Sequence, residues 1–424
     1  MEFFQNALFY IAGLGPMVMM PIVIIIIGLI LGVKFNTLFR AALLVGIGFA
    51  GINLAVGFFA NGVGPSAQAM VDVYNLQTDI LDVGWPARAA ATWAFPLAPV
   101  VILTVLGVNL LSLLIRWSRV VMVDFWSYNH FVFTAAITWY LTDSIPLAVV
   151  AAAIDAFIAF KLADWTAPLV EEYFKLPKIS FPTSNSIGWA PVAWLLEQVW
   201  SRIPGLKDLK ADPESIQRKF GVFGDPIVMG LVLGAIIGIL GRQSVQGILL
   251  VAMTAAASLY LIPKMMQILM EGLLPFADAI QVILEKRFKG EKFTIGVDAA
   301  LTMADTSVIA VGILMVPVTL FMAVVLPGNR ILPLPDLAIA AIWMAAWPVA
   351  FAKGNIVRGF LSTFLLMAVV LWIGTDLAPV QTSLALASGF EMPEGMTMVG
   401  GQDAGLHLLG YAVSKVLSFV ANLF

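Results

Sequence analysis

The sequence contains no cysteine, two histidines and few charged residues. Lys, Arg, Asp and Glu make up 12% of the 424 residues, where a soluble protein has about 25%. Without cysteine, the chain has no disulfide, no thiolate metal site and no cysteine nucleophile of its own. His130 and His407 alone cannot form a metal centre of several histidines, so we predict neither a metal nor a cofactor. The net charge of −3 gives no reason to expect nucleic acid as a partner.

Hydrophobic residues, by contrast, make up 61% of the chain, and the mean hydropathy is +0.96. A soluble domain could not bury so many apolar side chains, because too much of its area stays exposed. Apolar runs recur along the whole chain, and about 20 residues of helix suffice to cross a bilayer. The candidate spans lie near residues 7–33, 41–61, 93–115, 131–160, 226–241, 245–262, 306–326, 336–352, 356–374 and 404–422.

These runs predict an all-α polytopic integral membrane protein with about 10–11 transmembrane helices plus re-entrant or broken helices. Only helices and closed barrels satisfy their backbone groups in lipid, and the alternating pattern of barrel strands is absent from the sequence. Membrane lipid is therefore an expected partner. The run at 7–33 is not typical of a cleavable signal peptide, because it is long and has no basic start.

Charge is distributed unevenly between the connections. Segment 62–92 holds three aspartates against Arg88 alone, whereas several connections next to the candidate spans are basic. The positive-inside rule then predicts that the amino terminus and segment 62–92 lie outside an inner, cytoplasmic membrane. The basic residues expected in the cytoplasm include Lys34, Arg40, Arg116, Arg119 and Lys161.

The two most polar segments are residues 201–219 and a basic cluster at 286–292. They either anchor the topology or form a docking face for a soluble cytoplasmic protein. We treat residues 1–424 as a single transmembrane unit, with candidate halves 1–200 and 220–424 joined by the polar cytoplasmic segment 201–219. No repeat is visible between the halves at the level of residues.

Proline, glycine and polar residues interrupt the apolar runs at four places, residues 13–16, 82–86, 182–186 and 295–298. Non-helical backbone at membrane depth is tolerated only against protein or a water-filled cavity. Such interruptions also occur where transporters bind their solutes. We therefore expect a polar binding site at these breaks.

Two of the candidate site positions combine a polar group with a ring. Asp82 lies near Trp85, and this combination suits a polyol, because the carboxylate accepts hydroxyl protons while the indole covers the carbon chain. The alternative is an interfacial loop in which Asp82 pairs with Arg88. Asn129 and His130 form the second position, where the imidazole can accept a proton or bind a hydroxyl. The alternative for His130 is a structural histidine.

Thr183, Ser184 and Asn185 offer donors and acceptors without charge, which suits an uncharged substrate. They also fit the start of a helix, where such residues cap the first N–H groups. One of them can cap while its neighbours face a cavity.

Asp298 and Asp305 are the most prominent acids within an apolar region, with Glu271 as a further candidate. Spaced by seven residues, the two aspartates lie on one face if the segment is helical. Acids at bilayer depth are costly, so they are candidates for function. The alternative for Asp298 is a cap for the following helix.

Several sequence blocks resemble the membrane (C) component of enzyme II of the galactitol family, from the bacterial phosphoenolpyruvate-dependent sugar phosphotransferase system. The blocks keep the order of that family from about residue 10 to about residue 375. They are residues 15–26, 46–52, 82–86, 123–126, 216–226 and 327–333.

The resemblance implies a permease of the bacterial inner membrane that binds a polyol or sugar from outside and exposes it to the cytoplasm. A separate B component, which receives phosphate through an A component, would then donate phosphate from a phosphocysteine. The chain is therefore a permease subunit of a multi-component phosphotransferase and not an enzyme alone. Similar ascorbate-type permeases imply a homodimer with a fixed scaffold and a mobile core that moves like an elevator.

The predicted function is transport of a galactitol-like sugar alcohol coupled to its phosphorylation. A hydroxyl that attacks phosphorus must lose its proton, and Asp298 and His130 are the candidates to accept it. The remaining candidates would bind substrate: Asp82, Trp85, Asn129, Thr183, Ser184, Asn185, Glu271 and Asp305.

Two alternatives remain open. In an ion-coupled secondary transporter, Asp298 and Asp305 would bind a proton or a cation, and the solute would enter unmodified. A membrane scaffold without transport fits the many polar residues at helix breaks less well.

Overall fold

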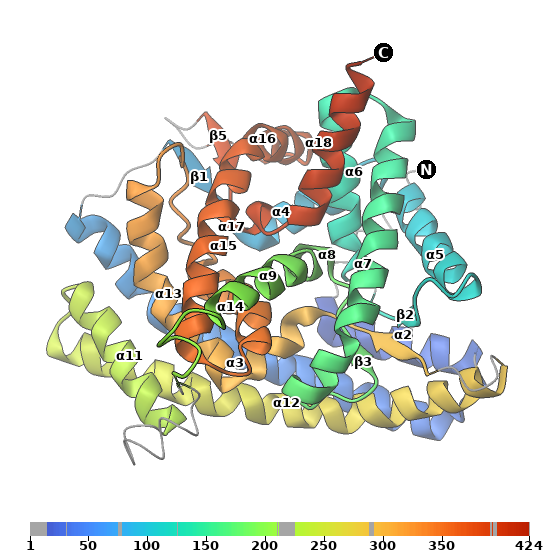
Figure 1. The fold of residues 1–424 in the computed structure, drawn as a ribbon, viewed down its shortest axis with the longest axis horizontal. Coiled ribbons are helices and arrows are strands. Elements are labelled where there is room, and N and C mark those ends of the chain that lie inside the picture. Colours follow the sequence, from blue (N-terminus) through green and yellow to red (C-terminus); the bar gives the residue numbers. More distant parts are fainter. Residues whose placement is uncertain are drawn as a thin grey trace.

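The structure is a computed structural model, and it describes residues 15–30, 32–74, 79–124, 126–209, 211, 225–287, 292–390, 392 and 397–423. The predicted break at 13–16 and most of the basic cluster 286–292 lie outside these residues or have side chains outside them. Residues 210 and 212–219 of the polar connection 201–219 also lie outside them. The described chain is largely helical, and a few short strands lie at the helix breaks (Figure 1).

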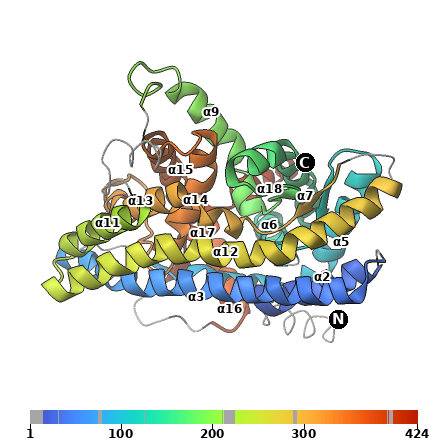
Figure 2. The same cartoon turned by 90° about the horizontal axis from the view of Figure 1, so that it is seen from below.

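Four helices form what we call the long-helix layer: α2 (Gly15–Ile30), α3 (Phe35–Tyr74), α11 (Pro226–Leu240) and α12 (Val245–Arg287). Figure 2 shows α3 and α12 side by side along one edge of the molecule. Their lengths are 40 and 43 residues. At 1.5 Å per residue, 40 residues span about 60 Å, twice the roughly 30 Å of a hydrocarbon core. Neither helix can therefore cross a bilayer upright along its whole length.

Small residues allow α3 and α12 to approach closely. A Cβ atom added at Gly48 would lie 2.4 Å from the Cβ of Leu269, and one at Gly272 would lie 2.5 Å from the carbonyl oxygen of Ala41. Both distances are too short for real atoms. Without a hydrophobic driving force inside lipid, helix pairs gain stability from such close packing.

The remaining elements form what we call the body. Its first part runs β1 (Ile80–Asp82), α4 (Gly84–Trp93), α5 (Ala98–Leu114), β2 (Val120–Met122), α6 (Tyr128–Thr142), α7 (Ile145–Phe174), β3 (Ile179–Ser180), α8 (Ser184–Ile187) and α9 (Ala190–Trp200). Its second part runs β4 (Thr294–Gly296), the 3-10 helix η2 (Ala299–Ala304), α13 (Thr306–Val325), α14 (Leu337–Phe351), α15 (Ile356–Asp376), α16 (Ala378–Ala387), β5 (Met398–Gly400), α17 (Gln402–Gly405) and α18 (Leu408–Ala421).

The short strands form two sheets, and each sheet contains strands from both parts of the body. In the three-stranded sheet, β4 of the second part lies between β2 and β3 of the first part, all parallel. In the two-stranded sheet, β1 of the first part pairs with β5 of the second part, and Ile80 also bridges to Ile331. These strand pairings link the two parts through backbone hydrogen bonds. They also bring together the ends of strands that are distant in the sequence.

The helices confirm a polytopic membrane protein. By length and composition, five helical stretches can cross a membrane, and α4 with α5 form a sixth candidate that bends by 92°. Four shorter apolar helices of 10–17 residues accompany them in the described chain. The prediction of about 10–11 transmembrane helices therefore exceeds the five or six spans that length and composition support in the described chain. The five long stretches are Phe35–Tyr74, Ile145–Phe174, Val245–Ala279, Thr306–Val325 and Ile356–Asp376.

Candidate functional site

A cavity of about 180 Å³, which we call the central cavity, lies between the long-helix layer and the body. One wall comes from α3, through Phe49, Ile52 and Asn53. The other walls come from the body and contain both aromatic and polar side chains. The aromatic residues are Trp85, Trp126 and Trp343, and the polar residues are Arg88, His130, Asn185, Asp298, Asp336 and Asp403.

The three-stranded sheet positions Asp298 at one side of this cavity. Asp298 follows β4, and its Oδ1 accepts a hydrogen bond from the backbone N–H of Ala300 at 2.6 Å. The hydroxyl of Ser127 donates to Oδ2 at 3.4 Å. Thr183 follows β3, and its Oγ1 accepts from the N–H of Ala299 at 3.1 Å while lying 3.2 Å from the Ser127 hydroxyl. The same Ser127 hydroxyl also donates to the buried carboxylate of Asp124, so Asp298 and Asp124 share one neutral donor.

The two-stranded sheet positions a charged group of residues at the other side. Asp82 ends β1 and accepts hydrogen bonds from the N–H groups of Gly84 at 2.9 Å and Gln402 at 3.4 Å. Asp336 accepts from the N–H of Trp85. The guanidinium of Arg88 forms a buried ion pair with Asp403, although the sequence offered Asp82 as its alternative partner. The carboxylate of Asp82 therefore binds backbone N–H groups, whereas the ion pair of Arg88 is formed with Asp403.

Arg88 is held from several directions. Besides the ion pair with Asp403, its Nη1 donates to Asn129 at 2.7 Å and to Thr92 at 3.3 Å. The guanidinium also lies over the ring of Phe133, at 5.1 Å from its centroid. Because three hydrogen-bond partners and an aromatic ring hold the buried guanidinium, Arg88 provides a fixed positive charge at the cavity.

The two histidines meet beside this charged group. Nδ1 of His130 lies 2.9 Å from Nε2 of His407, and Nδ1 of His407 lies 3.0 Å from the carbonyl oxygen of Asp403. His130 belongs to the first turn of α6, and His407 directly precedes α18. Residues from two distant regions thus form one hydrogen-bonded row.

Four of the predicted site residues line the central cavity: Trp85, His130, Asn185 and Asp298. Four others lie behind its wall, where they hold backbone or side chains in place: Asp82, Asn129, Thr183 and Ser184. Ser184, for example, donates to Asp155 at 2.6 Å, and Thr134 donates to the same carboxylate.

Two predicted site residues lie elsewhere. Asp305 caps α13, accepting from the N–H of Val308 at 3.0 Å and from the hydroxyl of Tyr173 at 3.0 Å. Asp298 and Asp305 do not share a helix face, because η2 and a new helix start separate them. Glu271 of α12 lines a separate depression beside Arg40.

Asp336 and Asp403 were not predicted as site residues, although both line the cavity. Asp336 directly precedes the apolar helix α14, and Asp403 lies in the first turn of the short helix α17. Asp298 shows the same signal, a carboxylate at the start of a helix that follows an extended segment. Applying this pattern to the whole chain would have found both residues.

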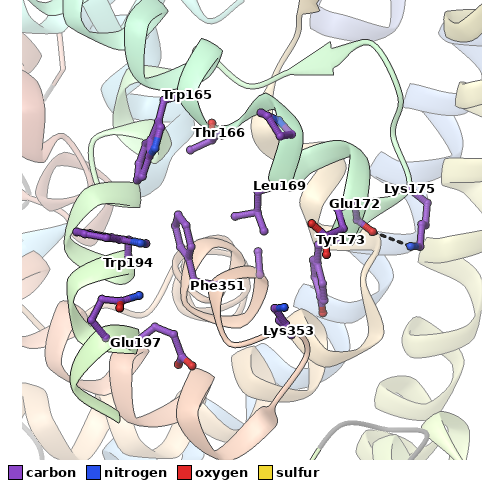
Figure 3. Close-up of a pocket in the computed structure, with 13 residues that line it drawn as sticks. Trp165, Thr166, Leu169, Glu172, Tyr173, Lys175, Trp194, Glu197, Phe351 and Lys353 are labelled. Atoms are coloured by element: carbon purple, nitrogen blue, oxygen red, sulfur yellow. Dashed lines mark hydrogen bonds between the residues drawn. The ribbon is translucent and has the colours of Figure 1, made fainter. Parts of the chain in front are cut away.

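A second cavity of about 460 Å³ opens between α7, α9 and the end of α14. Figure 3 shows Trp165 and Trp194 on one side of it and Tyr173 on the other. Although larger, it contains none of the polar residues that follow the strands, and its carboxylate Glu197 pairs with Arg358 at 3.4 Å. We therefore assign the candidate site to the central cavity.

Outside the apolar helices, Asp79 and Arg330 form an exposed ion pair next to β1. Hydrogen bonds from the Arg330 guanidinium lower the pKa of the Asp79 carboxyl below its ordinary value. The backbone of Arg330 also accepts from the N–H of Ile80 at 3.2 Å. This pair joins the two parts of the body at the open end of β1.

Comparison with known proteins identifies the family. A family model described as "PTS system sugar-specific permease component" matches residues 10–395. The "PTS system galactitol-specific EIIC component" of Escherichia coli, in strains K12 and O157:H7, is 38% identical over 415 residues, covering 98% of this chain and 91% of the relative. A "Putative permease IIC component" of strain K12 is 32% identical over 409 residues, covering 96% of this chain and 93% of the relative. The chain therefore belongs to the family of sugar-specific permease components of the PTS system.

Proposed function

We propose that the chain carries a galactitol-like sugar alcohol across the inner membrane and holds it for phosphorylation by a separate cytoplasmic B component. Permease components of this system work with a sugar substrate and with cytoplasmic A and B components. The relatives named galactitol-specific cover nearly the whole chain, which supports a sugar alcohol as substrate. The alternative of an ion-coupled transporter without substrate modification is not favoured by these similarities.

The observation that carries the proposal is a pair of unsatisfied polar atoms at the central cavity. Several of the described residues have a buried side-chain atom without a hydrogen-bond partner, and two of these atoms belong to the cavity lining: Oδ1 of Asn185 and Nε1 of Trp343. Buried polar atoms are almost always paired, so these two atoms point to a ligand. One accepts and the other donates a hydrogen bond, and a hydroxyl group does both.

The other lining residues suit the same ligand. Asp298 and Asp336 accept hydrogen bonds from hydroxyl groups, and the indole of Trp85 covers carbon atoms. The cavity of about 180 Å³ is smaller than the roughly 300–1,000 Å³ of sites for drug-sized ligands. A polyol with few heavy atoms fits that size. Sites built on hydrogen bonds also reject analogues that lack a hydroxyl strongly.

The position of the cavity supports an elevator-type movement. Its apolar wall, Phe49 and Ile52, belongs to the long-helix layer, and its polar walls belong to the body. In the proposed mechanism, the layer is the scaffold, forms the homodimer and stays fixed, while the body carries the substrate past it. Apolar side chains of α3 would then allow the body to slide without breaking hydrogen bonds.

Crosslinking tests this movement. Asn53 of α3 and Ala300 of the body both line the cavity, and the chain has no native cysteine. A disulfide between Asn53→Cys and Ala300→Cys should stop uptake, and reduction should restore it, while each single variant still transports. Uptake at the wild-type rate with the disulfide closed would contradict the elevator. Native mass spectrometry in detergent should show the mass of two chains.

Orientation is proposed from the basic connections. Arg119 and Lys161 share Asp164 at one side of the body, with Arg119 at 3.0 Å, and we place that side in the cytoplasm. Asp79 would then lie outside together with the amino terminus. A membrane-impermeant thiol reagent should label Asp79→Cys in intact cells, and Arg119→Cys only after permeabilisation. The reverse pattern would invert the topology.

Uptake of radiolabelled galactitol, followed by chemical analysis of the internal solute, tests the proposed function. In vesicles supplied with phosphorylated B component, we expect galactitol phosphate inside. Asp298→Asn should abolish uptake although the protein still inserts, because the amide replaces one acceptor oxygen by a donor. Glu271→Gln, an acid outside the cavity, is the matched control and should transport normally.

Two outcomes would count against the proposal. Normal uptake by Asp298→Asn would remove this residue from the site. Free galactitol inside, driven by a sodium or pH gradient, would favour the ion-coupled alternative.

A further inference from the structure

Two buried imidazoles lie at the charged side of the central cavity. His130 is 5% exposed and His407 is fully buried. Their ring centroids are 5.0 Å apart, and Phe133 packs against His407 at 4.7 Å. His130 lines the cavity, whereas His407 does not. One ring is therefore available to a ligand, and the other can act only through it.

The hydrogen bonds determine which nitrogen of each ring carries a proton. A buried imidazole is least costly when neutral, and a neutral imidazole has one N–H and one acceptor nitrogen. The carbonyl oxygen of Asp403 can only accept, so Nδ1 of His407, 3.0 Å away, carries the proton of that ring. Nε2 of His407 is then an acceptor, and Nδ1 of His130, at 2.9 Å, must donate to it.

Nε2 of His130 is therefore the acceptor nitrogen of its ring. Since the single proton of this ring is on Nδ1, Nε2 has a free lone pair. No hydrogen bond to this atom is found among the described residues, and the residue faces the central cavity. The row of Asp403, His407 and His130 thus ends in a proton acceptor at the place where the substrate is proposed to bind.

We infer that His130 accepts the proton of the substrate hydroxyl through Nε2, and that His407 is the positioning residue that fixes its tautomer. This inference rests on the proposed function. In the step, the hydroxyl oxygen forms a bond to the phosphorus of the phosphocysteine on the B component. The S–P bond breaks with its electron pair going to the thiolate, and the hydroxyl proton moves to Nε2 of His130.

The surroundings favour this role for His130 over Asp298. After accepting the proton, His130 still donates from Nδ1 to His407, so the row needs no rearrangement. The positive charge then faces a cavity lined by three carboxylates, Asp298, Asp336 and Asp403, against one guanidinium, Arg88. Both oxygens of Asp298 already accept hydrogen bonds, from Ala300 and Ser127. Each oxygen still has a second lone pair, with which Asp298 can accept a hydrogen bond from a substrate hydroxyl.

Two substitutions at position 407 separate tautomer control from packing. In His407→Gln the amide oxygen takes the place of Nε2 and still accepts from His130. In His407→Asn the shorter amide takes the place of Nδ1, keeps the bond to the Asp403 carbonyl and leaves His130 without its acceptor. Each variant keeps one of the two hydrogen bonds of His407 and loses the other, and only His407→Asn loses the bond that fixes the His130 tautomer. Both variants keep a polar amide side chain.

The first measurement is the rate of galactitol phosphorylation by phosphorylated B component, beside the Kd for galactitol. His407→Asn should lower the rate about 100-fold or more, the usual contribution of a general base. Its Kd should change less than about 3-fold, since His407 does not touch the ligand. His407→Gln should keep at least a tenth of the wild-type rate. A wild-type rate in His407→Asn, or equal losses of rate and binding in both variants, would overturn the inference.

The second measurement does not depend on transport. Because the chain has two histidines, a ¹⁵N-histidine spectrum contains signals from these residues alone, and their shifts report which nitrogen is protonated. We expect both rings protonated at Nδ1 in the wild type, with His130 losing this preference in His407→Asn and keeping it in His407→Gln. An Nε2-protonated His130 in the wild type would refute the tautomer assignment. Failure of the proposed function would instead appear as wild-type protein that neither binds nor phosphorylates galactitol, with the tautomers unchanged.

Discussion

The two sheets at the central cavity have a similar architecture, but the residues that surround them differ in charge. In both sheets, polar residues follow the ends of short parallel strands. Around the three-stranded sheet, Asp298 is bound by a hydroxyl and by backbone N–H groups. Around the two-stranded sheet, Asp82, Asp336 and Asp403 lie near the guanidinium of Arg88. One side of the cavity is therefore held by neutral hydrogen bonds and the other by charge balance.

This difference suggests a division of work between the sides. On the side of the three-stranded sheet, Asp298 and Asp124 share the neutral Ser127 hydroxyl. On the charged side, Arg88 compensates acids that would otherwise repel one another, and it does so beside the histidine row. We therefore expect substitutions on the charged side to affect folding most and those on the other side to affect it less.

The largest effect should follow removal of the cation on the charged side. Arg88→Met leaves Asp403 buried without its partner, and breaking a buried ion pair in this way typically costs about 3–5 kcal/mol. The purified variant should therefore show a large fall in thermal midpoint and in yield. Arg119→Met, which breaks an exposed pair with Asp164, is the control and should lose about 1 kcal/mol or less.

A double substitution sharpens this prediction. Arg88→Met combined with Asp403→Asn removes both charges of the pair, so the thermal midpoint should recover in part relative to Arg88→Met alone. No recovery would indicate that Arg88 stabilises the fold through Asn129 and Phe133, and not mainly through charge.

A smaller effect is expected on the neutral side. Thr183→Val keeps the shape of the side chain but removes the oxygen that accepts from the N–H of Ala299. A buried N–H without an acceptor costs about 1–3 kcal/mol, which a denaturant titration should detect. Thr104→Val is the control, because its exposed hydroxyl bonds only to the preceding helical turn. Equal losses in both variants would argue against a special role for Thr183.

The smallest effect concerns the exposed pair of Asp79 and Arg330. Because the pKa of Asp79 is lowered in the folded protein, its stabilising contribution is present above the unfolded pKa of about 3.9 and disappears as the pH falls through the folded value. The thermal midpoint of Asp79→Asn should therefore lie slightly below that of the wild type at pH 7. The two midpoints should converge once the pH falls below the folded pKa of Asp79, and a difference that persists there would exclude ionisation as its cause.

The sequence allowed the membrane class, the family and three of the helix breaks to be predicted, because each depends on local composition or on consecutive residues. The sequence singled out four residues that line the central cavity, Trp85, His130, Asn185 and Asp298, because polar or tryptophan side chains at breaks in apolar runs are conspicuous. The pairing of Ile80 with both Met398 and Ile331 could not be predicted, since nothing in a three-residue strand specifies a partner so distant in the chain.

Because pairing between distant strands could not be predicted, the sequence missed one residue of the cavity wall and proposed another that lies elsewhere. Asp403 lines the cavity only because β5 pairs with β1, so its own surroundings in the sequence gave little signal. Glu271 shares the pattern of an acid at the end of an apolar run, yet α12 continues past it and turns it towards another surface. Local pattern identifies costly acids, whereas tertiary pairing decides which of them meet.

The pairing of strands that are distant in the sequence has a consequence for biosynthesis. While the first part of the chain leaves the ribosome, β1 has no pairing partner, because Ile331 and Met398 have not yet been made. The sheet of β2 and β3 likewise lacks its middle strand until β4 is synthesised. The solute chamber can therefore close only after almost the whole polypeptide has entered the membrane, so a prematurely terminated chain has no complete chamber through which solutes could leak.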